Sequence, residues 1–159
     1  MISVRLSVND EPTEVRVGPT DTLLTTLREQ LHLNGARRGC DYGVCGACTV
    51  WIDGRPMRSC LALTWNCAGR SITTVESLDA AGELAPIQAA LLAEGGVQCG
   101  FCTGGVVMTA HALHAANPQP TRAEVREALS ANACRCSGFG AIVDAVMAVA
   151  HAPSKGVTA

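Results

Sequence analysis

The sequence has few aromatic residues: two Trp, one Tyr and two Phe in a chain of 159 residues. Because there are so few rings for base stacking, and because the formal net charge is -2, we expect no nucleic-acid partner. No apolar run reaches the roughly 18 residues that a membrane span needs. The first residues alternate apolar and polar side chains and contain neither a basic leader nor an apolar signal core. We therefore expect a cytoplasmic protein without membrane insertion.

Cysteine, in contrast, is abundant, with nine copies. Thiols in a reducing compartment rarely form disulfides, and an odd number without a secretion signal argues further against them. The chain also divides by pattern into two parts of roughly 75 residues each, a size at which a hydrophobic core alone gives marginal stability. The cysteines are therefore expected to bind metal.

The first part of the chain, residues 1–76, has the pattern of an α+β unit. Alternation and turn residues predict a hairpin, one helix and two further strand regions, at 2–17, 20–31, 49–57 and 71–78. The predicted hairpin has strands at 2–8 and 13–17. Thr20 or Asp21 is expected to cap the helix, and Asp53 with Gly54 is expected to form a tight turn.

The second part is rich in alanine and in helix signals. Pro86 suits the first position of a helix, Gly95 suits a stop, and Thr121 with Glu124 has the pattern of a capping box. Helices are predicted at 86–94, 103–116, 122–130 and 139–151. The predicted organisation is a first domain at 1–76, a linker at 77–84, a four-helix domain at 85–152 and a loose tail at 153–159.

The first cysteine set has the spacing C-x4-C-x2-C followed by a distant fourth residue: Cys40, Cys45, Cys48 and Cys60. This is the plant-type ligand spacing of a [2Fe-2S] cluster. The glycines between these cysteines allow the loop to wrap closely and to direct backbone N–H groups at sulfur. Zinc is the alternative, but zinc sites usually combine two short C-x2-4-C pairs, so the spacing fits zinc less well.

The second set consists of two close pairs: Cys99 and Cys102, then Cys134 and Cys136. Spacing alone allows zinc or a cluster. Each pair precedes a predicted helix, where free N–H groups and the positive end of the dipole stabilise thiolates and an anionic cluster, and this favours iron and sulfide. Cys67 belongs to neither set and is expected to be a small buried apolar residue.

Four segments carry a family resemblance: GCDYGVCGACTV, RSCLAL, VQCGFCTGG and NACRCSGFG. In them the chain resembles the iron-sulfur subunit of the molybdenum hydroxylases, the family of xanthine oxidase and carbon monoxide dehydrogenase. The resemblance implies an N-terminal β-grasp ferredoxin domain followed by a C-terminal four-helix domain, each with one [2Fe-2S] cluster. It also implies a large partner subunit with molybdopterin and a medium partner subunit with FAD.

The resemblance further implies that Gln98 hydrogen-bonds the pterin and that Cys136 approaches its amino group. The helical-domain cluster would then be near the pterin and the ferredoxin-type cluster toward the flavin. Three residues depart from the common family motifs: Gly104 replaces a proline, and Ser137 and Phe139 replace threonine and tyrosine. The glycine is expected to loosen the helix start by about 0.4 to 1 kcal/mol through the entropy of the unfolded chain.

The function that follows is electron transfer from a molybdopterin site, through two [2Fe-2S] clusters, to FAD or another acceptor. No residue of this chain is expected to be catalytic, and the substrate site is expected on a partner subunit. The four scattered histidines are expected to be packed or solvated. A freestanding two-cluster ferredoxin or redox sensor is one alternative, and a zinc-stabilised interaction module is another. The weakly charged helical part disfavours a freestanding shuttle, which usually presents a charged docking face.

Overall fold

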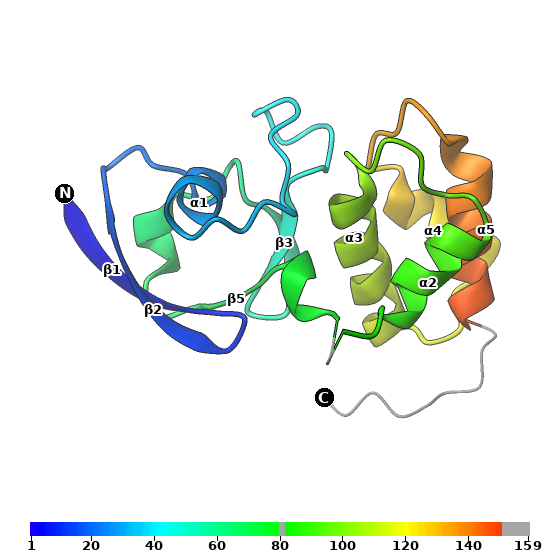
Figure 1. The fold of residues 1–159 in the computed structure, drawn as a ribbon, viewed down its shortest axis with the longest axis horizontal. Coiled ribbons are helices and arrows are strands. Elements are labelled where there is room, and N and C mark those ends of the chain that lie inside the picture. Colours follow the sequence, from blue (N-terminus) through cyan, green and yellow to red (C-terminus); the bar gives the residue numbers. More distant parts are fainter. Residues whose placement is uncertain (80–81, 151–159) are drawn as a thin grey trace.

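The structure is a computed structural model that describes residues 1–79 and 82–150 (Figure 1). In the first of these ranges, here called the sheet half, the strands form one mixed sheet in the order β2-β1-β5-β3-β4. β1 and β5 are parallel, whereas the other neighbouring strands are antiparallel. The strands are β1 (Ile2–Val8), β2 (Glu11–Val17), β3 (Thr49–Ile52), β4 (Arg55–Arg58) and β5 (Ser71–Thr73).

The predicted hairpin is confirmed, with a longer second strand than expected. Asn9 and Asp10 form its turn with φ values of 52° and 66°, which asparagine and aspartate tolerate better than most residues. β2 begins at Glu11 and continues through Pro12, which pairs with Ser7. Proline is accepted there because β2 is an edge strand of the sheet. The predicted turn at Asp53 and Gly54 also forms, between β3 and β4.

The predicted helix at 20–31 is shorter and differently wound. It consists of α1 (Leu23–Thr25) and a π-helical turn, η1 (Thr26–Gln30), so the expected caps at Thr20 and Asp21 were wrong. Thr22 is the cap: its hydroxyl accepts a hydrogen bond from the Thr25 N–H at 3.2 Å. This helical segment packs on the sheet through the fully buried Leu23, Leu24 and Leu27. The π-helical turn was not predicted, because no residue pattern in the sequence is specific to it.

The helical half, residues 82–150, contains the four helices that the sequence predicted: α2 (Pro86–Ala93), α3 (Thr103–Ala116), α4 (Arg122–Leu129) and α5 (Gly138–Ala150). Pro86 begins α2, and the capping box at α4 is present, with the Glu124 carboxylate accepting from the Thr121 N–H at 2.7 Å. The helices enclose a core of their own. Residues 80–81 of the predicted linker, residues 151–152 at the end of the predicted helical domain and the predicted tail at 153–159 lie outside the described residues. Two short 3-10 turns were not predicted, η2 (Thr64–Cys67) and η3 (Val75–Ser77). η3 lies within the strand region predicted at 71–78, which was wrong beyond Thr73, where β5 ends.

Among residues 1–79 and 82–150, no helix combines the length and hydropathy that crossing a membrane would require.

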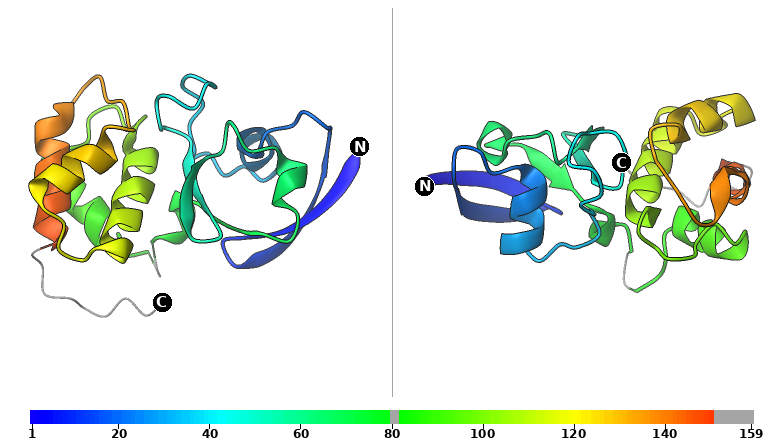
Figure 2. Two further views of the ribbon diagram at one scale, coloured as in Figure 1. Left: turned by 180° about the vertical axis from the view of Figure 1, so that it is seen from behind. Right: turned by 90° about the horizontal axis from the view of Figure 1, so that it is seen from above.

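The two halves meet where α3 lies against β3 (Figure 2). Trp51 of β3 donates its indole N–H to the Met108 carbonyl at 3.0 Å, and the imidazole of His111 stacks on the indole with ring centres 4.9 Å apart. Burial lowers the pKa of His111, which favours the neutral ring in this stack. His111 is therefore part of the packing between the halves, in agreement with the expectation for the histidines.

Glycines bring the two backbones into direct contact beside this stack. A Cβ at Gly105 would overlap the Gly46 carbonyl, and a Cβ at Gly104 would lie only 2.5 Å from the Gly35 carbonyl oxygen. The expectation that Gly104 merely loosens the start of α3 was therefore incomplete. Here glycine allows a close approach of two backbones that an added Cβ would push apart.

Replacing Gly104 with alanine should lower the free energy of unfolding by about 1–3 kcal/mol, because the added methyl group must push the backbone of Gly35 away from α3. Thermal and urea unfolding of the purified protein would measure the change. The matched control is Gly140→Ala in the first turn of α5, where an added Cβ meets no atom within 4 Å. The control should be neutral or stabilising by about 0.5–1 kcal/mol. Equal effects of the two substitutions would contradict this interpretation.

Candidate metal centres

The first cysteine set lies in the loop before β3 and directly after β4. Gly43 and Gly46 adopt φ values of 76° and 71°, which a residue with a side chain rarely adopts, and these two turns fold the loop back on itself. The Cys40 sulfur consequently accepts hydrogen bonds from the N–H groups of Tyr42 at 3.3 Å and Cys45 at 3.4 Å. The sequence predicted this role of the glycine-rich loop correctly.

Gly39 contributes in a second way. A Cβ at this position would lie 2.8 Å from the Cys45 sulfur and 3.5 Å from the ring of Phe101. The absence of a side chain leaves room for both groups, so the loop of the first set can lie against the loop of the second.

The thiols of the first set differ in their surroundings. The backbone N–H of Cys45, followed by that of Tyr42, lowers the pKa of Cys40 to about 6. Burial, followed by the neighbouring Cys48 thiol, raises the pKa of Cys60 to about 11. Since thiolate is the metal-binding form, the loop stabilises one thiolate by itself, whereas the buried Cys60 needs a bound cation to ionise near neutral pH.

The second set lies at the starts of α3 and α5. Cys99 and Cys136 are exposed, and their sulfurs are 3.6 Å apart. Cys102 is buried as the residue that precedes α3, and its thiol interacts with that of the half-buried Cys134. The chain thus brings together two pairs that are separated by 31 intervening residues.

Ser137 supports this second set. Its hydroxyl lies 3.3 Å from the Cys134 sulfur and 2.9 Å from the Gly96 carbonyl oxygen, so its single proton can be donated to either group. Burial opposes ionisation of Cys134, but hydrogen bonds from Ser137 and from the backbone outweigh it and lower the pKa to about 7. Burial, followed by the Cys134 thiol, raises the pKa of Cys102 to about 11. Serine at this departure from the family motif therefore retains the hydroxyl that contacts a thiol.

Both sets are organised as pairs of thiols. The interacting pairs are Cys40 with Cys45, Cys48 with Cys60, Cys99 with Cys136, and Cys102 with Cys134. Across the described ranges, no three His, Cys, Asp or Glu side chains converge as they would on a single metal ion. Pairs of thiolates are the donor arrangement of a [2Fe-2S] cluster, in which each of the two irons takes two protein ligands. The residues present therefore fit two such clusters.

The remaining cysteine, Cys67, lies apart in the core of the sheet half. Its thiol is 3.6 Å from the Leu63 carbonyl oxygen, and burial raises its pKa. These surroundings agree with the expected apolar role. Gln98, the residue expected to meet the pterin, is exposed next to Cys99.

The loop before Cys134 makes contacts with the sheet half that the sequence did not predict. The Ala133 N–H donates to the Cys45 carbonyl at 2.8 Å, and the Asn132 amide donates to the Gly46 carbonyl at 3.2 Å. Arg58 also reaches this loop, donating to the Ala131 carbonyl at 2.6 Å. These residue types carry no signal by themselves, because their partners lie more than 70 residues away in the sequence.

Two family models match this chain. One, described as a 2Fe-2S iron-sulfur cluster binding domain, matches residues 19–88, and the other, described as a [2Fe-2S] binding domain, matches residues 74–147. The fold and the thiol pairs thus belong to an iron-sulfur protein with two [2Fe-2S] binding domains.

The relatives are subunits of oxidoreductases. The nicotine 6-hydroxylase small subunit of Paenarthrobacter nicotinovorans is 47% identical over 92% of this chain and 88% of that protein. The aldehyde oxidoreductase iron-sulfur-binding subunit of Escherichia coli strain K12 is 38% identical over 92% of this chain and 70% of that protein. In the crystal structure of quinoline 2-oxidoreductase from Pseudomonas putida 86, one chain matches with a TM-score of 0.91 and 44% identity, covering 94% of this chain and 92% of that one. The chain belongs to the iron-sulfur subunits of the molybdenum hydroxylases.

Replacing Cys67 with serine should leave the iron content unchanged and reduce the free energy of unfolding by about 1–3 kcal/mol, because a hydroxyl replaces a thiol in an apolar core. Iron analysis and thermal unfolding would measure the two effects. The matched comparison is Cys48→Ser, at a buried cysteine of the first set, which should lose the iron of one cluster. Loss of iron from the Cys67 variant would mean that a ligand has been misassigned.

Proposed function

We propose that this chain is the electron-transfer subunit of a molybdenum-dependent hydroxylase or dehydrogenase complex, passing electrons from a molybdopterin site to FAD or another acceptor. The observation that carries this proposal is the direct contact of two four-thiol loops, through the hydrogen bond from the Ala133 N–H to the Cys45 carbonyl. A [2Fe-2S] cluster in each loop would exchange one electron at a time. The chain itself holds the two sites at a fixed separation.

The proposed ligands are the eight cysteines that lie in the two sets. For the first cluster these are Cys40, Cys45, Cys48 and Cys60, and for the second they are Cys99, Cys102, Cys134 and Cys136. The support is the pairing of the thiols within each set and the presence in each set of a thiol with a lowered pKa. The backbone N–H groups that surround Cys40 would also stabilise the negative charge of a bound cluster.

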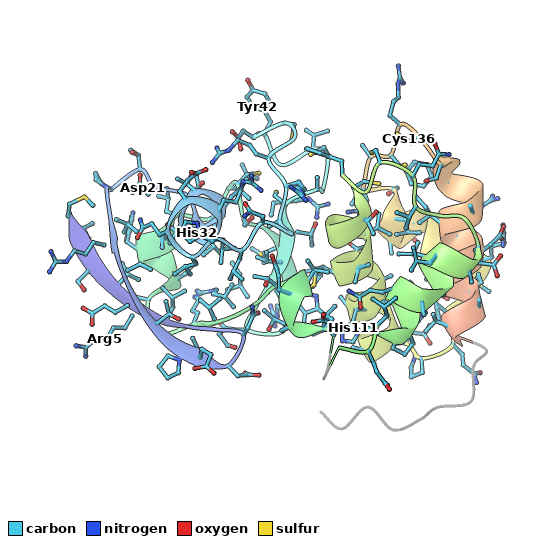
Figure 3. The ribbon with its side chains drawn as sticks, in the orientation of Figure 1. Arg5, Asp21, His32, Tyr42, His111 and Cys136 are labelled. Atoms are coloured by element: carbon cyan, nitrogen blue, oxygen red, sulfur yellow. The ribbon has the colours of Figure 1, made fainter. Side chains whose placement is uncertain are left out.

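The large, molybdopterin-bearing subunit is proposed to cover the exposed pair of the second set. Cys99, Cys136 and Gln98 lie together on the surface, and Figure 3 shows Cys136 at the top of the helical half, on the same side of the molecule as Tyr42. Gln98 would hydrogen-bond the pterin, and Cys136 would approach its amino group. A medium subunit with FAD is proposed to lie toward the first loop, where the exposed Tyr42 projects outward (Figure 3).

The finer description of the fold belongs to the same proposal. The sheet half would be a β-grasp ferredoxin domain at 1–76, joined by a linker at 77–84 to a four-helix domain at 85–152. Two separate hydrophobic cores, one in each half, support this division. The cytoplasm is the proposed compartment, since nine cysteines would be kept reduced there.

The substrate site is proposed to lie on the large subunit. The half-buried histidines of α3 are engaged in packing: His111 stacks on Trp51, and His114 lies 3.1 Å from the Val146 carbonyl. Burial lowers the pKa of both histidines. Their contacts explain them without a catalytic role.

Purification through a tag on this chain would test the proposed function. We expect four irons and four labile sulfides per copy, because the eight thiolates of the two sets would hold two [2Fe-2S] clusters. A larger protein that contains molybdenum should co-purify with the chain. Zinc in place of iron would contradict the ligand proposal. Full iron in a chain that never binds a partner would instead favour the freestanding ferredoxin or redox sensor.

Replacing Gln98 with alanine should preserve the iron content but weaken the hold on the pterin by about 1–3 kcal/mol, because a polar group of the pterin would lose its partner. Pterin release during mild heating of the complex, compared with iron retention, would measure the effect. Gln119→Ala is the control, since Gln119 is an exposed residue before α4 and distant in sequence from the cysteine loops. Pterin retention equal to that of the unsubstituted complex would argue against this role of Gln98.

A further inference from the structure

Arg58, the last residue of β4, joins three segments of the chain that carry proposed cluster ligands. One nitrogen of its guanidinium group, Nη1, donates to the Thr49 hydroxyl, and the other, Nη2, donates to the Ala131 carbonyl at 2.6 Å. Thr49 directly follows Cys48, Arg58 precedes Cys60 by two residues, and Ala131 precedes Cys134 by three. One planar group therefore connects both buried ligands of the first set to the loop of the second.

The Thr49 hydroxyl extends this connection into the interior. It donates to the Gly46 carbonyl at 2.6 Å, and the Asn132 amide donates to the same carbonyl at 3.2 Å. Thr49 and Asn132 are each about 1% exposed. Arg58, Thr49, Gly46 and Asn132 thus form a hydrogen-bonded network that crosses from the sheet half to the helical half.

Arg58 supplies the charged bonds of this network. Hydrogen bonds from a guanidinium are stronger than those between neutral groups, and the rigid fork sets the directions of both bonds at once. The Arg58 side chain also lines an apolar groove of about 670 Å³, together with Met57, Leu61 and Leu113. The residue thus borders a groove lined by side chains of both halves, while its guanidinium group reaches Ala131.

We propose that Arg58 is a positioning residue that sets the separation of the two iron-sulfur clusters, by tying the loop before Cys134 to the β3–β4 pair. This inference rests on the proposed function. Electron transfer slows steeply as two centres move apart, and the magnetic interaction between two reduced clusters also weakens with distance. Loss of the fork leaves the loop before Cys134 held across the junction by neutral hydrogen bonds, from Ala133 and Asn132.

The test uses the intact complex with Arg58→Met, which retains much of the apolar stem, and Arg58→Lys, which keeps the charge but cannot form the two-bond fork. The control is Arg55→Met, at an exposed arginine on the same strand. Iron content is measured first. After full reduction with dithionite, the electron paramagnetic resonance spectrum at low temperature reports the splitting that each cluster causes in the other.

We expect the two clusters to be present in all variants and the inter-cluster splitting to weaken in Arg58→Met. Arg58→Lys should be intermediate, and Arg55→Met should match the unsubstituted complex. Splitting of full size in an iron-loaded Arg58→Met complex would overturn the inference. If Arg58→Met does not assemble, Arg58→Lys decides, and full splitting in that variant overturns it. An unsubstituted complex without iron would overturn the proposed function itself, and with it this inference.

Discussion

The hydrogen bond between the Ala133 N–H and the Cys45 carbonyl is the contact on which much of the remaining structure depends. For it to form, the backbone of one cysteine loop must lie directly against the other. Gly46 and Gly105 make room on the two sides, because a Cβ on either would meet backbone or side-chain atoms of the opposite half. The stack of Trp51 on His111 then fixes α3 against β3 below the loops. Gly46 and Gly105 thus have the same role, which is to let the backbones of the two halves come into contact.

Local signals in the sequence were sufficient for most elements. Pro86 and the Thr121–Glu124 box predicted helix starts, because caps and proline act within one turn of the chain. The alternating hairpin strands were equally local. The helix after β2 was predicted less well: its cap is Thr22, and its second turn is π-helical, a winding that the spacing of the apolar residues does not predict.

The candidate site divides in the same way. Cysteine spacing grouped the eight thiols into sets of four, and the structure brings the members of each set into interacting pairs. The supports between the sets could not be predicted from the sequence, because they join residues far apart in the chain. From the sequence, Arg58 is an ordinary strand residue and Gly104 only weakens a helix start. Their contacts with the carbonyl oxygens of Ala131 and Gly35 are known only from the structure. Tertiary proximity, which no single-residue preference encodes, gives these residues their roles.

The two pairs of the second set differ in exposure, and this difference indicates on which side a partner could approach them. Cys99 and Cys136 face the surface, whereas Cys102 and Cys134 face inward. Cys134, of the inward pair, directly follows Ala133, whose N–H donates to the Cys45 carbonyl. The inward pair is therefore the one that is linked to the loop of the first set. In the proposed complex, a partner that covers the exposed pair would therefore lie on one side of the second set, with the loop of Cys45 on the other. In the proposed complex, the large subunit would exclude water from these two exposed cysteines.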